Sequence, residues 1–239
     1  MDPVTELARL IDHSLLHPTL TDDQLKTGCE LAKRYRTASV CIKPYAVRQA
    51  REWLEGSGVL TGTVIGFPHG NSAISVKAAE TRRACEDGAV EIDMVMNIGK
   101  VLGESWNYAD EEIRAVLDVC REHGAVLKVI FENDFLTEDR FKIRLCELCR
   151  EAGVDYVKTS TGYGFVKTAA GTYGYRGATD HDLKLMLHHA GPNVKVKAAG
   201  GIRTLDDLLR VRELGVSRVG ASATAAMLEE AKVRYGNDQ

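Results

Sequence analysis

Eight short apolar runs recur along the chain, and a longer stretch with helical periodicity follows each of them. The runs are residues 8–11, 38–42, 60–65, 89–95, 126–131, 154–158, 194–198 and 218–220. Their richness in Val, Ile and Ala is typical of strands buried on both faces of a parallel sheet. Helices are predicted at 21–35, 45–55, 73–87, 108–123, 137–152, 179–189, 205–214 and after Ser222. This alternation predicts an α/β fold, a (β/α)8 TIM barrel in a single domain, which commonly takes about 250 residues.

Residue types at the ends of the predicted helices support this division. Four helical stretches end in a glycine that precedes the next apolar run: Gly88, Gly124, Gly153 and Gly215. Glycine is favoured there because a helix often ends in a left-handed conformation. Thr21, Thr137 and Thr204 are the predicted N-caps, and acidic residues follow each of them.

An open, doubly wound sheet is the alternative to the barrel. Such a sheet more often has about five to seven strands and a glycine-rich nucleotide turn after the first strand. No such turn is present near Ile11. One stretch, 163–178, is rich in Gly, Tyr and Thr and too long for a simple turn from strand to helix. We expect it to be an insert in a barrel domain spanning 1–239, either a small hairpin or a mobile lid over the barrel mouth.

The charge balance argues against several classes of function. The formal net charge is −3 at pH 7, so no basic excess indicates a nucleic-acid or membrane-surface binder. The chain has no run of about eighteen apolar residues and no basic-then-apolar leader. We therefore expect a cytoplasmic protein with small-molecule partners and with no nucleic-acid or membrane partner. A homodimer stays open as its assembly.

Neither the cysteines nor the histidines form a pattern typical of metal ligands. Reduced thiols that act as small apolar residues are the expectation for a cytosolic protein. Cys146 and Cys149 fit one helix face, but no second pair accompanies them as a zinc site would require. His13 and His17 are four residues apart, yet Pro18 and their place after the first predicted strand argue against a helical ligand pair. No metal or other cofactor is predicted.

Charged residues interrupt several of the predicted strands. Glu91 and Asp93 lie in the fourth run, Lys128 in the fifth, Lys158 at the end of the sixth and Lys197 near the end of the seventh. A lysine inside a buried strand is unfavourable unless it is paired, so each one needs a partner or a chemical role. The active sites of (β/α)8 barrels lie at the C-terminal ends of the strands, where several of these residues are expected.

Two interpretations of these lysines are open. In one, they form structural ion pairs with nearby carboxylates, among them Glu132 and Asp155. In the other, Lys158 and Lys197 lie on adjacent strands about 5 Å apart, and burial and the neighbouring positive charge lower a lysine pKa. Asp93, two strands away, is then expected to move protons through a water. The alternation does not decide which side chains face the barrel axis.

A lowered lysine pKa has a large chemical effect. A lysine with a pKa of about 10.4 is only about 0.04% neutral at pH 7, and a drop of about three units raises this fraction to about 30%. A neutral amine attacks an aldehyde to form an imine, which then accepts electrons during cleavage of a C–C bond. Paired lysines with an aspartate at nearby strand ends therefore favour a Schiff-base aldolase.

The last two loops of the predicted barrel favour an anion site. Gly200 and Gly201 follow the seventh run, and Gly220 and Ser222 follow the eighth. Glycines let backbone N–H groups approach an anion closely, and a helix that begins after Ser222 directs its N-terminus at it. Because these loops are the usual phosphate site of the fold, we expect them to bind a phosphate. An ordinary pair of helix-start turns is the alternative.

Six segments, taken together and in order, resemble the deoxyribose-phosphate aldolase family. They are IDHSLL at 11–16, VCI at 40–42, VIGFPHG at 64–70, EIDMV at 91–95, VKTSTG at 157–162 and VKAAGGIRT at 196–204. The resemblance runs from about residue 9 to residue 222 and implies a (β/α)8 barrel. It also implies a class I aldolase that, without a metal, reversibly cleaves 2-deoxy-D-ribose 5-phosphate to D-glyceraldehyde 3-phosphate and acetaldehyde.

The resemblance also assigns roles to single residues. Lys158 would form the imine, Lys197 would perturb its pKa and share in proton transfer, and Asp93 would be the acid–base carboxylate. The remaining site residues would bind the substrate or its phosphate: Gly200, Gly201, Gly220, Ser222, Thr161, Asp12, Cys41 and Lys128. Without the resemblance, the choice between the two lysines as nucleophile stays open.

The chain departs from the family pattern at one position. Some family members have a lysine directly after Thr-Ser-Thr-Gly that helps to bind the phosphate, and this chain has Tyr163. Lys167 or Arg176 of the insert would replace that charge, or the enzyme depends less on the phosphate. A phosphate-binding isomerase or epimerase, and a regulatory barrel that binds a sugar phosphate, are the competing functions.

Overall fold

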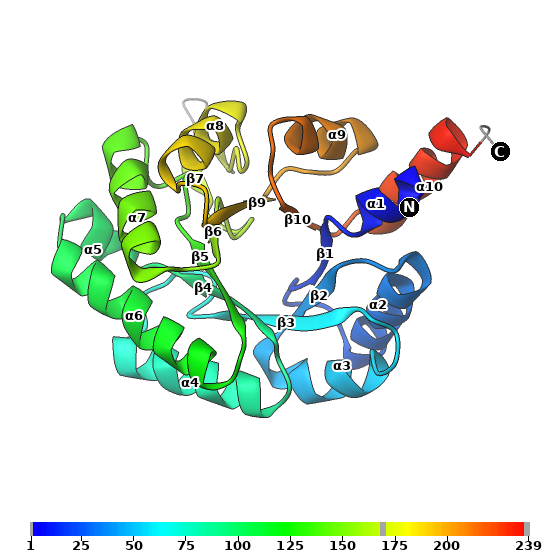
Figure 1. The fold of residues 1–239 in the computed structure, drawn as a ribbon, viewed down its shortest axis with the longest axis horizontal. Helices are drawn as coiled ribbons and strands as arrows, with labels where there is room; N and C mark the ends of the chain where they lie inside the picture. Colours follow the sequence, from blue (N-terminus) through cyan, green and yellow to red (C-terminus); the bar gives the residue numbers. More distant parts are fainter. Residues whose placement is uncertain (1, 168–170, 237–239) are drawn as a thin grey trace.

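The computed structural model describes residues 2–167 and 171–236, and eight parallel strands form a closed barrel at its centre (Figure 1). The strand order around the barrel is β1-β10-β9-β6-β5-β4-β3-β2. The strands are β1 (Ile11–Leu15), β2 (Ser39–Ile42), β3 (Leu60–Ile65), β4 (Glu91–Val95), β5 (Val126–Ile130), β6 (Tyr156–Lys158), β9 (Lys195–Ala199) and β10 (Arg218–Ala221). The predicted (β/α)8 barrel is confirmed.

Helices surround the barrel on its outer side (Figure 1). They are α1 (Pro3–Ala8), α2 (Asp22–Tyr35), the 3-10 turn η1 (Pro44–Ala46), α3 (Val47–Trp53), α4 (Ile74–Glu86), α5 (Ile98–Leu102), α6 (Trp106–Glu122), α7 (Asp139–Ala152), α8 (Asp180–His189), α9 (Leu205–Glu213) and α10 (Thr224–Tyr235). The seven helices predicted with both ends lie within two residues of observed ones. The short helix α5 was not predicted from the sequence.

The first predicted strand is wrong, although the other seven lie within two residues of observed strands. The helix α1 ends at Ala8 and β1 begins only at Ile11, so most of the run 8–11 lies before the strand. The Asp2 side chain caps α1 by accepting a hydrogen bond from the backbone N–H of Thr5. The apolar run is therefore shared between the buried end of a helix and the start of a strand. As a consequence, Asp12 lies inside β1 and not after it.

Most of the predicted helix caps are confirmed. The four glycines after helical stretches all have positive φ: Gly88, Gly124, Gly153 and Gly215. Thr21 and Thr204 both form capping boxes at the starts of α2 and α9. Thr137 does not cap α7, because that helix begins two residues later and its N-cap is Glu138, without a side-chain hydrogen bond.

The strands direct alternate residues to opposite sides of the barrel wall. In β4, Ile92 and Met94 belong to the hydrophobic core cluster, whereas Glu91 and Asp93 form ion pairs in the interior. Lys128 of β5 is the register partner of Asp93 and is also paired there. This period of two places the apolar members against the helices and the charged members inside the barrel.

The insert contains a small hairpin. Strand β7 (Val166–Lys167) pairs with β8 (Tyr173–Gly174) in antiparallel register. Residues 168–170 of the insert lie outside the described residues. Asp134, which follows β5, accepts hydrogen bonds from the backbone N–H groups of Arg176 and Gly177 at 2.6 and 2.9 Å. These bonds anchor the returning arm of the hairpin, while movement of the insert as a lid stays a prediction.

The cysteine pair on α7 packs as apolar side chains. Cys146 and Cys149 are free thiols buried in the hydrophobic core cluster. Burial raises the pKa of Cys146 to about 12 and that of Cys149 well above its ordinary value. Neither thiol is therefore ionised near neutral pH. Within 2–167 and 171–236, no helix has the length and apolar character that a membrane crossing needs.

Candidate active site

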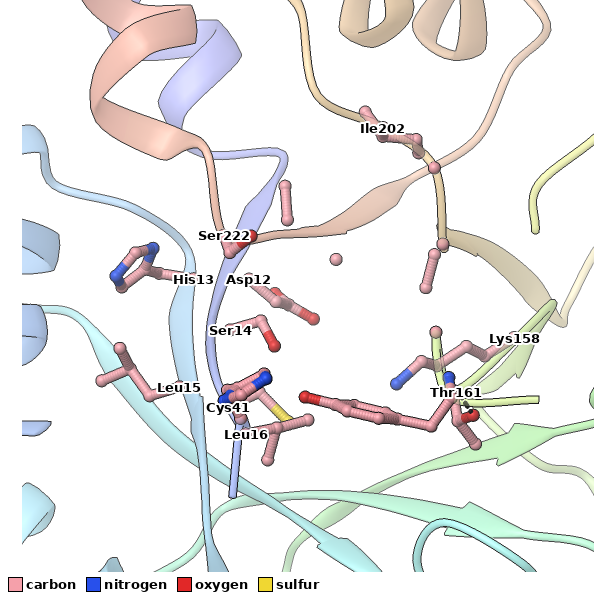
Figure 2. Close-up of a pocket in the computed structure, with 18 of the residues that line it drawn as sticks. Asp12, His13, Ser14, Leu15, Leu16, Cys41, Lys158, Thr161, Ile202 and Ser222 are labelled. Carbon is pink, nitrogen blue, oxygen red and sulfur yellow. Dashed lines mark hydrogen bonds between the residues drawn. The ribbon is translucent and has the colours of Figure 1, made fainter. Parts of the chain in front are cut away.

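A cavity of about 410 Å³ opens at the C-terminal end of the barrel (Figure 2). Figure 2 shows the side chain of Lys158 entering it from one side, opposite Asp12 of β1. Nine of the predicted site residues line the cavity: Asp12, Cys41, Lys158, Thr161, Lys197, Gly200, Gly201, Gly220 and Ser222. The other two, Asp93 and Lys128, are buried against it at 0% and 1% exposure. The structure thus gathers residues that are far apart in the sequence around one cavity.

Two lysines share one carboxylate oxygen next to the cavity. Lys158 of β6 and Lys197 of β9 are register partners, and each donates to Asp93 Oδ2 at 2.7 Å. The Asp93 carboxylate therefore contacts both amines directly, and proton transfer from Asp93 through a water stays a prediction. Since both nitrogens lie 2.7 Å from the same oxygen, they are separated by at most twice that distance.

The surroundings shift the two lysine pKa values in opposite directions. Burial lowers the pKa of Lys158, and the positive charge of Lys197 lowers it further, while Asp93 opposes both effects. Burial also disfavours the charge on Lys197, but Asp12 and Asp93 outweigh it and raise the pKa of that lysine. The difference follows from the partners: Asp12 Oδ2 lies 2.5 Å from Lys197, which therefore contacts two carboxylates. Lys158 is thus the amine that is more easily neutral.

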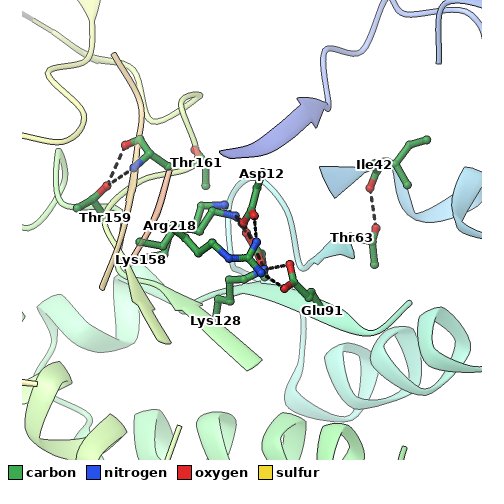
Figure 3. A network of polar contacts seen from close by, with 12 residues as sticks. Asp12, Ile42, Thr63, Glu91, Lys128, Lys158, Thr159, Thr161 and Arg218 are labelled. Carbon is green, nitrogen blue, oxygen red and sulfur yellow. Dashed lines mark hydrogen bonds and ion pairs between the residues drawn. The ribbon is translucent and has the colours of Figure 1, made fainter. Parts of the chain in front are cut away.

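A wider set of buried ion pairs supports this centre (Figure 3). Lys128 Nζ donates to Glu91 Oε2 at 2.7 Å and to Asp93 Oδ1 at 2.9 Å. Although burial disfavours its charge, these carboxylates hold the pKa of Lys128 well above its ordinary value. Arg218 of β10 donates to both Asp12 and Glu91. Lys128 is therefore part of the ion-pair network and not of the cavity lining.

The loops after β9 and β10 form one end of the cavity with little side-chain bulk. Gly200 and Gly201 have φ values of +88° and +80°, a region that strongly favours glycine. A Cβ on Gly220, which lies in β10, would be 3.2 Å from Ala199 Cβ, a tight contact, and 3.4 Å from Lys197 Cε. Ser222 lines the same end, just before α10 begins.

Thr161 is fixed by Glu132, which the sequence predicts only as an ion-pair partner of the buried lysines. Glu132, just after β5, accepts hydrogen bonds from the Thr161 hydroxyl and backbone N–H. Burial raises the pKa of Glu132, against the effect of these hydrogen bonds. Glu132 has a φ of +60°, a conformation that is uncommon for a residue with a side chain and is held by the surrounding structure. This network fixes the segment that follows Lys158.

Two aromatic residues of the insert line the cavity. Tyr163 contacts Phe67 edge to face, with ring centroids 5.5 Å apart. Tyr175 accepts a hydrogen bond from Arg203 Nη2 at 3.3 Å, and both side chains belong to the lining. The alternative phosphate partners Lys167 and Arg176 are exposed and lie outside the lining. The sequence motif contained Arg203, but only the fold brings Tyr175 to it.

One cluster outside the cavity has the composition of a metal site. Among the described residues, Asp139, His181 and Asp182 place one ligand atom each within 4.8 Å of one another. Lys142 Nζ already lies 3.0 Å from Asp139 and 2.5 Å from Asp182. The two carboxylates are therefore paired with an ammonium group. The cluster lies on α7 and α8 and contributes nothing to the cavity lining.

The barrel and its unequal pair of buried lysines define an enzyme that reacts with carbonyl carbons through an amine. Residues 7–227 match the model of the DeoC/LacD family aldolase, and the chain belongs to this family. A deoxyribose-phosphate aldolase of Rhodopirellula baltica is 50% identical over 97% of this chain and 91% of its own length. One from Thermococcus gammatolerans is 42% identical over 95% of this chain and 97% of its own length.

Solved structures give the same result. The tetrameric structure of deoxyribose phosphate aldolase from Aeropyrum pernix superposes with a TM-score of 0.84 at 30% identity, and the match covers 96% of this chain and 92% of that one. A protein described as QR15, an aldolase, gives a TM-score of 0.88 at 31% identity and covers 98% and 99% of the two chains.

Proposed function

We propose that this protein is a deoxyribose-phosphate aldolase in which Lys158 is the nucleophile. The reaction is the reversible cleavage of 2-deoxy-D-ribose 5-phosphate to D-glyceraldehyde 3-phosphate and acetaldehyde. One observation carries the choice of lysine: Lys158 and Lys197 share Asp93 Oδ2, but Lys197 also contacts Asp12 at 2.5 Å. Lys158 therefore loses its proton more easily and is the better nucleophile.

The first half of the reaction forms an imine. The neutral amine of Lys158 attacks C1 of the open-chain sugar, and the carbinolamine loses water to give a protonated imine. Lys197 is protonated and Asp93 is ionised, because the pKa of Lys197 is raised and that of Asp93 is held well below its usual range, despite burial, by the surrounding lysines. A proton donor and a proton acceptor thus lie beside the reacting nitrogen, as this step requires.

The second half breaks the bond between C2 and C3. A base in the Asp93 cluster takes the proton of the C3 hydroxyl, and the electrons of the C2–C3 bond move into the imine. The products are D-glyceraldehyde 3-phosphate and an enamine on Lys158. Protonation of the enamine at C2 and addition of water release acetaldehyde and restore the amine. The water lost in the first half is consumed here, so the reaction balances.

The loops after β9 and β10 are the proposed phosphate site. Gly200, Gly201 and Ser222 lie together at the end of the cavity that Arg203 also lines. A phosphate there would meet backbone N–H groups, a serine hydroxyl and a guanidinium group, which are its usual protein partners. We infer that Arg203, and neither Lys167 nor Arg176, supplies the cation that the family pattern places at position 163.

The competing functions receive less support from this site. An isomerase or epimerase would need the phosphate loops but not two lysines that share a carboxylate. A regulatory barrel would not need a lysine with a lowered pKa next to its ligand. A cytoplasmic location and a homodimer stay predictions, and the tetramer described for Aeropyrum pernix concerns that protein.

Borohydride trapping tests the proposed nucleophile. The protein is incubated with acetaldehyde, reduced with borohydride and digested, and the peptides are mapped by mass spectrometry. We expect one ethyl group on Lys158, while Lys128 and Lys197 serve as internal controls. An adduct on a different lysine, or no adduct, would contradict the proposal. Cleavage of the phosphorylated and unphosphorylated sugar by the same preparation then tests the substrate.

A further inference from the structure

Seven ionisable side chains form one buried ion-pair network across the barrel (Figure 3). Its members are Asp12, Glu91, Asp93, Lys128, Lys158, Lys197 and Arg218. None of them is more than 9% exposed. If every member were charged, four positive charges would face three negative charges. A positive charge without a counter-charge is unfavourable away from water, and a buried amine removes it by losing its proton.

The basic members differ in how many carboxylates hold them. Lys128 lies within 3.5 Å of three carboxylates, and Lys197 lies within 2.7 Å of two. Arg218 contacts two, Asp12 and Glu91. Among the described residues, Lys158 has a single carboxylate within salt-bridge distance. Lys158 is therefore the member that loses least when it gives up its charge.

Arg218 differs from the lysines because a guanidinium group does not release its proton in proteins. We propose that Arg218 is a positioning residue: its permanent charge occupies Asp12 and Glu91, leaves the lysines one counter-charge short, and so keeps Lys158 as a free amine. This inference rests on the proposed role of Lys158 as nucleophile. Arg218 and Glu91 do not line the cavity, so they act through the network and not on the substrate.

Three further titratable side chains lie close to the network: Cys41, Glu132 and Tyr156. Burial raises the pKa of Cys41 of β2 to about 11, so its thiol is uncharged near neutral pH. Glu132 accepts hydrogen bonds from Thr161, and burial raises its pKa, while these hydrogen bonds and the positive charge of Lys158 oppose that effect. Tyr156 of β6 lies near Arg218. None of these side chains forms a salt bridge with a member of the network in the described part of the chain.

The direction of each pKa shift agrees with the number of carboxylates that the basic side chain contacts. Burial disfavours the charge on all four basic members. For Lys128, Lys197 and Arg218 the surrounding carboxylates outweigh burial, and their pKa values are raised. Only for Lys158, within this set of four, is the pKa lowered.

Two neutral substitutions test the inference with shifts of opposite sign. Arg218→Met removes one positive charge, so three lysines face three carboxylates and Lys158 can keep its proton. We expect the acid limb of the pH profile of kcat/KM to move up by about one unit or more, with about a tenfold loss at pH 7 for each unit and recovery at higher pH. Glu91→Gln removes a counter-charge and is expected to move the same limb down.

The double variant R218M/E91Q serves as the matched control. It again leaves the network with one excess positive charge, so its acid limb should return toward that of the wild type. Arg218→Lys places an amine there that can lose its proton in place of Lys158, so its acid limb should also move up, by less than that of Arg218→Met. Circular dichroism checks folding, and if Arg218→Met does not fold, the direction of the Glu91→Gln shift alone decides. A purely structural role would lower activity at all pH values alike.

Borohydride trapping distinguishes an incorrect role of Arg218 from an incorrect role of Lys158. If wild-type protein carries the adduct on Lys158, but the acid limbs of the folded variants coincide with that of the wild type, the role of Arg218 is overturned and the proposed function stands. If wild-type protein carries no adduct on Lys158, the proposed nucleophile is wrong and this inference falls with it. If Glu91→Gln moves the limb up, the charge balance is refuted.

Discussion

Replacing Lys197 by Met tests whether the two active-site amines are coupled. Their nitrogens are at most twice 2.7 Å apart, because both contact Asp93 Oδ2. Two unit charges about 5 Å apart interact by about 3 kcal/mol at an effective dielectric constant of about 20. This energy corresponds to about two pKa units. Lys197→Met also leaves Asp93 to Lys158 and Lys128, and both effects raise the pKa of Lys158.

The expected result is a displaced pH profile. Below its pKa, the neutral fraction of Lys158 falls about tenfold for each unit by which the pKa rises, so the rate of imine formation at pH 7 should fall by about 100-fold. Part of this loss should be recovered at higher pH, where Lys158 is again deprotonated. The part that is not recovered measures the contribution of Lys197 to proton transfer itself.

The assay is the rate of borohydride-trapped adduct formation between pH 5 and 10 with a fixed acetaldehyde concentration. Lys195→Met is the matched control, because Lys195 is an exposed residue of the same strand. We expect its profile to follow that of the wild type. If the acid limb of Lys197→Met stays in place while the plateau falls, the amines are not electrostatically coupled, and the reasoning from the shared carboxylate is refuted.

Three further predictions concern other parts of the structure. Lys77 and Glu112 form a fully buried ion pair between α4 and α6. Lys77→Met and Glu112→Gln should each lower the free energy of unfolding, measured by urea denaturation, by about 3–5 kcal/mol. The double variant should lower it by less than the sum of the two single effects. Tyr175→Phe removes the hydroxyl that accepts a hydrogen bond from Arg203. KM for the phosphorylated sugar should rise about fivefold, while KM for the unphosphorylated sugar should change little. Gly220→Ala places a Cβ 3.2 Å from Ala199 Cβ and 3.4 Å from Lys197 Cε. Because the tight contact pushes on the strand that carries Lys197, we expect kcat to fall while the melting temperature changes little, and an unchanged kcat would show that Lys197 is not displaced.

The repeated local pattern of the chain was enough to predict most of the fold. Glycines that end helices, such as Gly153 with its φ of +76°, and capping threonines such as Thr21 act within a few residues and are therefore visible in the sequence. The first strand was misplaced because the run at 8–11 contains the end of α1 as well as the start of β1. The five-residue helix α5 was missed because it is too short to show a helical period.

The active-site residues were predictable to different degrees. Lysines in apolar strands indicated unusual chemistry, and the family motifs selected Lys158 from among them. The same argument from burial applies to Arg218, which lies in the last apolar run and was overlooked. Tyr175 gave no comparable indication, because its contact with Arg203 joins segments 28 residues apart through the hairpin.

The sequence by itself determined the barrel, the charged residues within its strands and the glycines near the C-terminal ends of β9 and β10. These features depend on residue type and on spacing along the chain, so they follow from local physical chemistry. Only the tertiary structure decided which lysine is more easily neutral. That decision depends on how many carboxylates each amine contacts, and Asp12, Glu91 and Asp93 reach the lysines only after the sheet has closed into a barrel.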